Sequence, residues 1–466
     1  MPDTSKPSRL PETLILPVET LNREFDAKLH LALRAAARGW KVIFGGRTAI
    51  HQRLPSLPRS VYLAKGIRTG NRRILRLLDN FGHVIVALDE ESLIRQSDEA
   101  LLMMLDEETF NRPRLLYAWG KSDADVWRRF KGYQGTPILE FGNPRADMLR
   151  PELSAYYRPQ VEALNQRFGD FVLVSSNFSM VNHYIADHVR FRTAAGTDTA
   201  RRDEIKTGIV AHKQIVFDAF RTMVPELARM IAPMTLVVRP HPSEKAATWE
   251  QAAAGLANVE VIHDGPMAPW LMAARLLIQN GCTSAVEAAI IGTPALAYHP
   301  VVSNQFEVEL SDGLSRDCRT LDELLAATRT VLAQPRQAGR RIDAAQMRLL
   351  HHHIASVEGP LSSERILDSL EAHADILQTP ALRPAAYLQG LASHYRRQAI
   401  RAVTTRLPGS PSSASYTAHK FPGIGDDMID SCIQRFRAVI PELPDFRRRQ
   451  IAAGIFEIEK VGPRHD

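Results

Sequence analysis

Two polar loops in the second half of the chain carry residues that suit the binding of an anion. Each loop follows a short apolar run and precedes a helical pattern, in the segments LVVRPHPSEK from position 236 and LLIQNGCTSAVEAAIIGTPALAY from position 276. The candidates are Arg239, His241, Ser243, Glu244, Asn280, Gly281, Thr283, Ser284 and Glu287. Ligands of open α/β sheets bind beyond the carboxyl ends of the strands, where helix N–H groups favour negative charge. We therefore expect these two loops, on neighbouring strand–helix units, to form one phosphate site.

Each loop also has a purely structural interpretation. Ser284 and Glu287 have the spacing of a capping box, in which the two side chains satisfy N–H groups at the start of a helix. The prolines at 240 and 242 restrict the residues before them and could make 239–242 no more than a rigid turn. Taken one at a time, the loops favour the structural interpretation. Taken together, they favour the phosphate site.

Three consecutive acids follow an apolar run in the first half of the chain. Asp89, Glu90 and Glu91 come directly after the expected buried strand at 83–88. At the carboxyl end of a strand they could supply a general base or a nucleophile. On a surface loop the same three acids would be ordinary. The residues by themselves leave both interpretations open.

A further charged segment, ETLNREFD, lies where the first expected strand ends and a helix begins. Acids suit the positive end of a helix dipole, but Arg23 does not, so a substrate contact and a solvated first turn are equally compatible with the segment. Polar residues follow two further strands, near 41–44 and 171–174. The substrate-binding candidates are Glu19, Arg23, Glu24, Asp26, Arg47, Asn177 and Ser179.

The elements that must position these residues alternate between strand and helix patterns, which predicts an α/β fold of doubly wound sheets. A chain of 466 residues exceeds what one core usually supports. We expect a disordered N-terminus at 1–12 and an N-terminal Rossmann-like domain at 13–169, which carries the acidic loop. A nucleotide-binding Rossmann-like domain should follow at 170–375, with a mobile insertion near 180–205. A helical C-terminal extension is expected at 376–466.

Composition narrows the class of protein. Lys and Arg number 58 against 52 Asp and Glu, a formal net charge of +6 that favours anionic ligands or an anionic membrane surface. The chain lacks zinc-finger spacing, an aromatic-basic stripe and a basic arm, so no nucleic-acid partner is expected. Three scattered cysteines give neither a disulfide framework nor a zinc site and favour a reducing compartment.

The N-terminus lacks the apolar core of a signal peptide, and no run approaches the roughly 18 apolar residues of a spanning helix. We expect a cytoplasmic protein, at most peripheral at the inner face of the inner membrane. The tail arginines are either solvated or in weak contact with anionic lipid; they are Arg396, Arg397, Arg401, Arg406, Arg447, Arg448 and Arg449. The run His351-His352-His353 is expected to be non-functional, because consecutive residues fan around a helix.

The order of these motifs resembles a known family. The segments ETLNREFD, LDEES, GNPRAD, SSNFS, RPHPSE and NGCTSAVEA are similar to those of bacterial surface-carbohydrate biosynthesis proteins, relatives of capsule-polysaccharide Kdo transferases and glycerol-phosphate polymerases. The resemblance spans about 13–375 and reaches weakly into the tail at HKFPGI, 419–424. It implies a GT-B-like fold, in which two Rossmann-type domains face each other across a cleft.

The resemblance also implies roles for single residues. His241, before Pro242, would contact the nucleotide phosphate, Thr283 and Ser284 would bind the same phosphate, and Glu287 would hold the ribose. Glu90 and Glu91 match an acidic pair that supplies the base or nucleophile. Ser92 stands where that pattern has Gly, so the acting residue among Asp89, Glu90 and Glu91 is not decided.

The implied activity is that of a glycosyltransferase without a cofactor. No clear metal-binding acid pair accompanies the phosphate loops, so we also expect the activity to be independent of metal. It would transfer Kdo or another ulosonic acid from a CMP-activated donor to a glycan or lipid-linked acceptor, in the synthesis of a capsule or lipopolysaccharide. Two alternatives remain open at this point. One is a polyol-phosphate transferase of the CDP-glycerol type, and the other is a non-catalytic scaffold of polysaccharide assembly.

Overall fold

The computed structural model describes residues 10–95, 97–184, 199–303, 305–336, 342–405, 421 and 423–462, with the side chains of 199–206 excluded. The chain forms two compact units, which we call the first and second unit. The first comprises Met1–Leu93, Asp98–Tyr156 and His351–Asp466, and the second comprises Ile94–Ser97 and Tyr157–Leu350. Residues 1–9 of the predicted disordered N-terminus and most of the insertion near 180–205 lie outside the described residues.

The first unit is built on an eight-stranded sheet in the order β13-β14-β2-β1-β3-β4-β5-β6. Its parallel strands are β1 (Thr13–Val18), β2 (Lys41–Gly46), β3 (Val61–Ala64), β4 (Val84–Leu88), β5 (Leu115–Ala118) and β6 (Ile138–Glu140). Every residue of β1, β3, β4 and β5 is buried, as expected for parallel strands covered on both faces. The order β2-β1-β3-β4-β5 is that of a flavodoxin-like sheet, whose ligand site lies where the order reverses, between β1 and β3.

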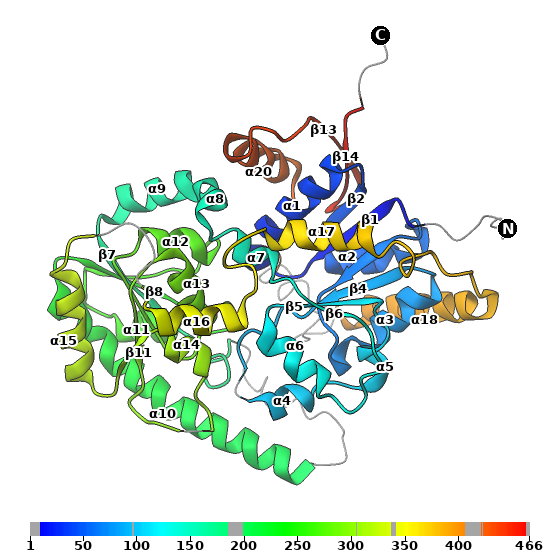
Figure 1. Cartoon of the computed structure of the whole chain (residues 1–466). Coiled ribbons are helices and arrows are strands. Elements are labelled where there is room, and N and C mark those ends of the chain that lie inside the picture. The colour runs from blue at the N-terminus through cyan, green and yellow to red at the C-terminus, as the bar shows by residue number, and fades with distance from the viewer. Residues whose placement is uncertain are drawn as a thin grey trace. The chain divides into compact units, whose positions relative to one another are not determined.

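Helices cover this sheet on both faces (Figure 1). In chain order they are α1 (Leu21–Ala37), α2 (Arg47–Arg53), α3 (Arg72–Asn80), α4 (Asp98–Leu102), α5 (Glu107–Phe110), α6 (Lys121–Arg128), α7 (Pro144–Asp147) and α8 (Pro151–Ser154). The C-terminal part adds α17 (Ser362–Ala372), α18 (Pro384–Thr404) and α20 (Asp426–Val439). The core of the face that α2, α3 and α6 cover includes Ile50, Leu78 and Trp127, all fully buried.

The chain returns to the first unit at His351, earlier than the boundary predicted at 375. The reason is a buried carboxylate at the start of α17. Asp147 accepts hydrogen bonds from the Ser362 N–H, the Ser363 N–H and the Ser363 hydroxyl, each at 2.8 Å. Arg34 on α1 contacts Glu364 at 2.5 Å. The segment GNPRAD therefore anchors a helix that lies more than 200 residues further along the sequence.

The prediction of a helical tail is wrong at its end. Residues Phe446–Ala452 (β13) and Ile455–Lys460 (β14) form an antiparallel hairpin, and β14 pairs with β2 at the edge of the sheet (Figure 1). A backbone that reaches an open sheet edge can satisfy its N–H and C=O groups there, which the local helical pattern of the tail does not reveal.

The second unit contains a six-stranded, fully parallel sheet in the order β12-β11-β10-β7-β8-β9. Its strands are β7 (Phe171–Ser175), β8 (Thr235–Arg239), β9 (Val259–Val261), β10 (Leu276–Gln279), β11 (Ala295–Tyr298) and β12 (Arg316–Cys318). Counted within the unit, this is the 3-2-1-4-5-6 order of dinucleotide-binding folds, so the order reverses between β7 and β10.

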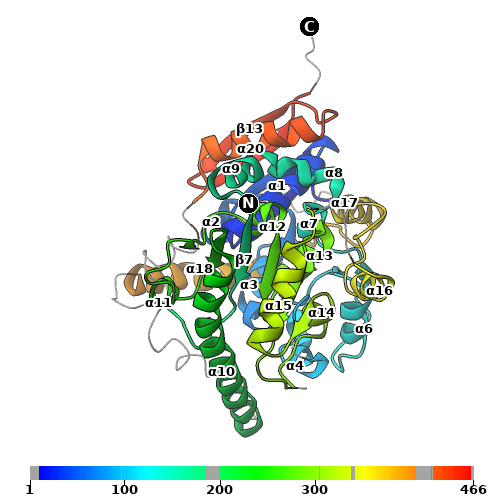
Figure 2. The ribbon, with the colours of Figure 1, turned by 90° about the vertical axis from the view of Figure 1, so that its left-hand side faces the viewer.

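Two separate cores, one on each face, make this sheet doubly wound. Its helices are α9 (Arg158–Phe168), α10 (Thr199–Ile231), α11 (Ala246–Ala252), α12 (Met267–Ala273), α13 (Thr283–Ile291), α14 (Glu309–Gly313), α15 (Leu321–Leu332) and α16 (Ala344–His353). A 3₁₀ turn at Ala155–Tyr157 separates α8 from α9. Figure 2 shows α10 as the longest helix.

The two units thus confirm the predicted α/β fold of two Rossmann-type sheets, with helices in the C-terminal part. That the units face each other across a cleft stays a prediction.

Candidate functional site

The candidate phosphate loops lie on either side of the central strand of the second unit. The RPHP segment follows β8 and the NGCTS segment follows β10, while β7 pairs with both strands and lies between them. We had expected the two loops to follow neighbouring strands. They do not, because β7 lies between β8 and β10. Three neighbouring strands end together instead, and the middle one contributes the segment SSNFS. This edge includes the point at which the strand order reverses, which is where such sheets bind ligands.

Glu244 holds two of these three loops together from the inside. Its side chain is buried, and one carboxylate oxygen accepts from the Ser176 hydroxyl at 2.9 Å and the Phe178 N–H at 2.8 Å. The other oxygen accepts from the Trp249 indole at 3.0 Å. Burial raises the pKa of Glu244, against the opposing effect of these donors. The sequence predicted Glu244 as a residue that binds the nucleotide donor. In the structure its carboxylate instead joins the loops after β7 and β8.

Arg239 is also directed into the protein. Its guanidinium donates to the backbone carbonyls of Asp264 and Gly265 at 2.8 and 3.0 Å and lies 4.6 Å from the centre of the Trp270 ring. Only 5% of the residue is exposed, and burial lowers its pKa to about 10. The arginine of RPHP therefore fixes the loop at 264–265.

His241, like Pro242 after it, is exposed in the RPHP segment. Its Nδ1 atom accepts a hydrogen bond from the Ser243 N–H at 3.2 Å. A neutral imidazole that accepts at Nδ1 carries its proton on Nε2, so Nε2–H is a donor. The Ser243 backbone thereby sets the tautomer that suits an acceptor oxygen, such as that of a phosphate.

The start of α13 excludes the capping-box interpretation of Ser284 and Glu287. The helix begins at Thr283, its N-cap is Cys282, and no side chain caps it, so Ser284 already lies within the first turn. Among the described residues, none accepts a hydrogen bond from the N–H of Thr283 or Ser284. The Ser284 hydroxyl, on a residue that is 2% exposed, has no hydrogen-bond partner there either. Such a helix start offers N–H groups to an anion.

Gly281 lets the backbone turn into this helix. Its φ of +57° lies in the left-handed region, which glycine adopts without steric cost. Its carbonyl accepts from the Asn177 side chain at 3.2 Å, which ties the loop after β7 to the loop after β10. Asn177, predicted as a substrate-binding residue, therefore contacts the loop that carries Gly281, and its role stays a prediction.

A lysine that the sequence did not single out completes this group. Lys213, on α10, donates from Nζ to the Asn280 side-chain oxygen at 2.9 Å, and a Cβ on Gly281 would lie 3.9 Å from Nζ. Burial lowers the pKa of Lys213. Lys213 lies in the middle of a long helix and not in a loop at the end of a strand, so no motif in the sequence points to it. Its proximity to the start of α13 arises only when α10 packs against the sheet.

Asn280 itself is a buried link between strands. Its amide nitrogen donates to the Tyr298 carbonyl at 3.1 Å, while its oxygen accepts from Lys213. Three other predicted residues, Thr283, Glu287 and Ser179, are half-buried. Thr283 is the first residue of α13, and Glu287 lies one turn further along that helix, whereas Ser179 lies in the turn after SSNF.

In the first unit, a buried ion network fixes two of the predicted acids. Lys28 donates to Glu24 and to the Pro17 carbonyl, both at 2.8 Å, and lies 3.5 Å from Glu90. Asn143 donates to the other Glu90 oxygen at 3.2 Å. Burial raises the pKa of Glu24, but Lys28 and the Glu19 N–H outweigh it and hold that pKa at about 2. Glu24 and Glu90 therefore join α1, β1 and the loop after β4 within the protein.

The remaining two acids after β4 differ sharply in exposure. Asp89 is 1% exposed, contacts Arg68 at 3.0 Å and accepts from the Glu91 N–H, and burial raises its pKa. The Glu91 side chain is 46% exposed and pairs with Arg23 at 3.1 Å. Arg23 also donates to the Glu90 carbonyl at 2.7 Å. Of the three acids, only Glu91 presents its carboxylate to solvent, which separates residues that the sequence left equivalent.

Glu19 marks the point at which the strand order of the first unit reverses. Glu19 follows β1. It pairs with Lys65, which follows β3, and with Arg47, which follows β2 and lies 3.1 Å away. Burial raises the pKa of Glu19, but these two cations outweigh it and lower that pKa overall. Glu19, Arg23, Glu24 and Arg47, which the sequence predicted as substrate-binding residues, therefore lie near one another, and their role stays a prediction. Lys65 and Arg68 are additional cations there that the sequence did not indicate.

Asp26 lies away from this group. It accepts a hydrogen bond from the Tyr156 hydroxyl at 2.7 Å, and the Tyr156 ring stacks on Phe436 of α20 with ring centres 4.2 Å apart. Helical periodicity explains the difference, because Asp26 is two residues after Glu24 and so faces another side of α1. Its position favours a role in docking the C-terminal helix over a substrate contact.

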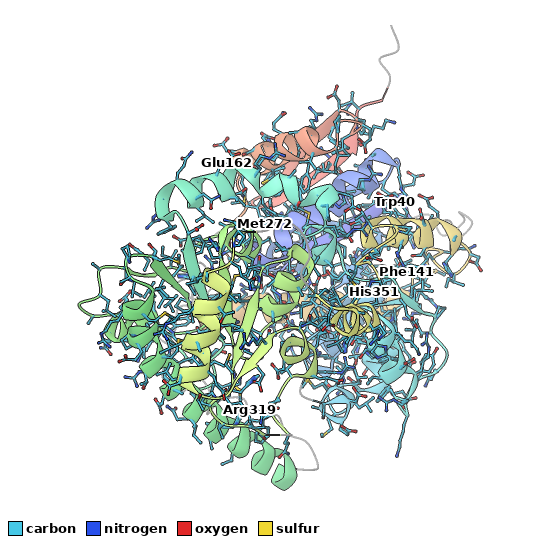
Figure 3. All side chains as sticks on the ribbon, turned by 60° about the vertical axis from the view of Figure 1, so that its left-hand side comes forward. Trp40, Phe141, Glu162, Met272, Arg319 and His351 are labelled. Carbon is cyan, nitrogen blue, oxygen red and sulfur yellow. The ribbon has the colours of Figure 1, made fainter. Side chains whose placement is uncertain are left out.

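Other sequence predictions concern metals, membranes and the histidine run. Within the described ranges, no group of three or more His, Cys, Asp or Glu residues could hold a metal ion, and metal independence stays a prediction. The described helices include none that is both long and apolar enough to cross a bilayer. His351, labelled in Figure 3 on α16, pairs with Glu358 at 3.6 Å.

Comparison with known proteins gives similarity to solved structures alone. No protein-family model and no curated protein sequence matches the chain. UDP-GlcNAc 2-epimerase of Methanocaldococcus jannaschii has a TM-score of 0.46 and 14% identity, covering 77% of this chain and 99% of that one. The wall teichoic acid polymerase TagF has a TM-score of 0.47 and 10% identity, covering 80% of this chain and 90% of that one. HepE of Anabaena in complex with UDP-glucose has a TM-score of 0.43 and 10% identity, covering 77% of this chain and 99% of that one.

Proposed function

We propose that the chain is a glycosyltransferase whose second unit binds a nucleotide sugar. The observation that carries this proposal is the group at the strand ends of that unit. The first turn of α13 has N–H groups without a described acceptor, Ser284 has a buried hydroxyl without a described partner, and Lys213 places a cation beside them. A nucleotide phosphate provides the negative charge and the acceptor oxygens that such a group lacks. The Nε2–H of His241 is a further donor for that phosphate.

The proposed reaction breaks the bond between the sugar and the nucleotide phosphate. As that bond breaks, negative charge grows on the departing phosphate oxygen, and fixed donors and a lysine stabilise this charge without rearranging. The acceptor hydroxyl forms the new bond to the sugar and loses its proton to a carboxylate.

Glu91 is the carboxylate that we assign to this step. Its side chain is 46% exposed and pairs with Arg23 at 3.1 Å. Asp89 and Glu90 are each at most 2% exposed and have their oxygens engaged within the protein. In a retaining reaction the same carboxylate would instead attack the sugar and form a covalent intermediate.

The donor and product are proposed from the resemblance of the motifs. We propose a CMP-activated ulosonic acid, such as Kdo, as the donor and a glycan or lipid-linked acceptor in the synthesis of a surface polysaccharide. Transfer of a polyol phosphate from CDP-glycerol is the second candidate, because the same phosphate-binding group would serve it.

A panel of donors tests the proposal. Purified protein is incubated with CMP-Kdo, other CMP-nonulosonates, CDP-glycerol, UDP-glucose and GDP-mannose, and release of the free nucleotide is measured. We expect release from a CMP-linked donor, and release from CDP-glycerol alone would favour the second candidate. If none of these nucleotides binds or is released, the chain is better described as a non-catalytic scaffold.

The variant Glu91→Gln separates catalysis from binding. It should lower turnover by about 100- to 10,000-fold, the usual contribution of a general base, while donor binding stays unchanged. The matched control is Glu90→Gln, which should lower the free energy of unfolding, because Glu90 is buried against Lys28 and Asn143. Equal turnover in the wild type and Glu91→Gln would show that Glu91 is not the base.

A further inference from the structure

Helix α18 runs antiparallel to α3 on the first unit. Tyr387 and His394 lie beside Phe81, the residue that ends α3, with ring centres 5.5 and 6.2 Å apart. Further along α18, the Gln398 side chain donates to the Gln52 carbonyl of α2 at 3.0 Å. Figure 1 shows α18 beside α3. The C-terminal half of α18 therefore lies toward the start of α3 and against α2.

Two arginines of α18 share the face that packs against the first unit. Gly390, His394, Arg397 and Arg401 follow one another at intervals of four, three and four residues, which places them on one side of the helix. Gly390 permits the close approach, because a Cβ there would lie 3.0 Å from the Phe81 ring. His394 is buried, Arg401 is half-buried and Arg397 is exposed. The two guanidinium groups therefore continue the packed face to a place that a ligand can reach.

Two more arginines lie where α2 and α3 begin, at the carboxyl ends of β2 and β3. Arg47 is the first residue of α2, and Arg73 lies in the first turn of α3. Burial lowers the pKa of His51, in α2, well below its ordinary value, and four arginine charges lower it further. These four residues, which we call the arginine group, are Arg47, Arg73, Arg397 and Arg401. The arginine group thus gathers around one side chain of α2.

Three members of the arginine group lack a counter-charge. In the part of the chain that the structure describes, no ion pair and no hydrogen bond engages the guanidinium groups of Arg73, Arg397 and Arg401. The stretch 406–420, which follows α18 in the sequence, contains no Asp or Glu and so cannot supply a carboxylate. Burial lowers the pKa of Arg73 and of Arg401, and the charge of Arg397 lowers each further. These three side chains therefore repel one another.

The remaining charges and the helix ends do not offset this repulsion. Arg47 pairs with Glu19 at 3.1 Å, but Glu19 also pairs with Lys65. Arg401, in the last turn of α18, suits the dipole of its helix, whereas Arg73, in the first turn of α3, lies where a cation is unfavourable. A bound anion would remove the repulsion that the free protein carries.

We propose that the arginine group binds a phosphate or diphosphate group of the acceptor substrate. Guanidinium groups are planar and donate pairs of hydrogen bonds that match phosphate oxygens. A diphosphate carries more than one negative charge, so it suits several arginines better than a single carboxylate does. Arg47 joins the group to Glu19, where the strand order of the first unit reverses and such sheets bind ligands. That the ligand is the acceptor rests on the function proposed above, whereas the anion site does not.

Titration calorimetry with inorganic pyrophosphate tests the site without any donor. The parent protein is Lys213→Met, because this change should weaken the anion site of the second unit. Adding Arg397→Gln and Arg401→Gln should raise the Kd for pyrophosphate by at least about tenfold, the usual effect of losing a hydrogen bond between charged groups. Without ligand, urea unfolding should show that these two changes leave stability equal or higher, because repulsion is removed. Pyrophosphate should stabilise the parent more than this variant.

Farnesyl diphosphate distinguishes two sources of the phosphate group. Binding that is tighter than that of pyrophosphate, and that the two α18 changes weaken, supports the site with a lipid-linked acceptor. Equal binding of the two compounds, weakened in the same way, supports the site with a water-soluble phosphorylated acceptor.

The matched control adds Arg447→Gln and Arg449→Gln to the same parent. Both side chains are 68% exposed and pair with Glu459 and Glu457, and the same formal charge is lost, so the Kd for pyrophosphate should equal that of the parent. Circular dichroism checks that each variant keeps its helices.

Four outcomes would overturn the anion site. They are no pyrophosphate binding by the parent, an equal Kd in the α18 variant, an equal rise in the control, and a loss of stability in the α18 variant without ligand. The last would show that the arginines hold the fold. Pyrophosphate binding by the arginine group, together with no nucleotide binding in the donor panel, would support the anion site and overturn its assignment to an acceptor.

Discussion

Lys213 offers the sharpest test of the anion site, because the sequence did not indicate it. Replacement by Met keeps most of the side-chain length and removes the charge. In the free protein the change should be small, within about 1 kcal/mol in the free energy of unfolding. One hydrogen bond to Asn280, worth about 1 kcal/mol, is lost, while the cost of burying a charge, seen in the lowered pKa of Lys213, is relieved.

Nucleotide binding should respond far more strongly. A hydrogen bond to a charged group contributes about 1.5–3 kcal/mol, so Lys213→Met should raise the Kd for the nucleotide by about 10- to 100-fold. Titration calorimetry measures this Kd, with the nucleotide that the donor panel identifies, and urea unfolding measures stability. The opposite outcome, an unchanged Kd with a large loss of stability, would show that Lys213 is a structural residue and would refute the assignment.

A control on the same helix excludes a general effect of charge. Arg229 lies at the far end of α10, is 59% exposed and pairs with Glu226. Arg229→Met removes the same charge and should leave both the Kd and the stability unchanged. A similar rise in Kd in both variants would mean that net charge, and not the position of Lys213, controls binding.

Two further predictions concern buried groups. Glu244→Gln should lower the free energy of unfolding by about 3 kcal/mol, because an amide nitrogen cannot accept the two hydrogen bonds that one carboxylate oxygen accepts from Asn182 and Trp249; urea unfolding that matches the wild type would contradict this. His83 has a pKa lowered to about 4 by burial, below its ordinary 6.5, so the unfolded chain binds its proton first as pH falls. The wild type should therefore lose about 2 kcal/mol more stability between pH 7 and pH 5 than His83→Phe, and parallel losses in the two proteins would show that His83 does not contribute.

Local pattern was sufficient to predict several central strands of both sheets. The strands expected near 41–44, 83–88 and 171–174 match β2, β4 and β7 within a few residues, because buried parallel strands appear as short apolar runs. The apolar runs before the two candidate loops likewise match β8 and β10. The polar residues at their ends followed from the same reasoning, since parallel strands place their carboxyl ends on one edge. The fold class and the candidate loops were therefore determined by the sequence alone.

Pairing between distant segments decided the rest. The sequence could not reveal that β7 lies between β8 and β10, nor that β14 joins the edge of β2, because strand order depends on contacts between residues far apart in the chain. For the same reason, the sequence could not show which charged side chains are buried or which residues they pair with. Asp89, Glu90 and Glu91 are adjacent in sequence, yet Arg68, Asn143 and Arg23 reach them from three different parts of the chain.

The sequence thus determined which residue types gather at the strand ends, because the period of a strand and the direction of a parallel sheet are local properties. The tertiary structure decided which of them remain available to a ligand. Arg239 and Glu244 have the charges that a site needs, but burial commits them to holding loops, whereas Lys213 is brought to the start of α13 only by the packing of a helix. Burial and hydrogen bonding are properties of the whole chain, so no motif alone could make that distinction.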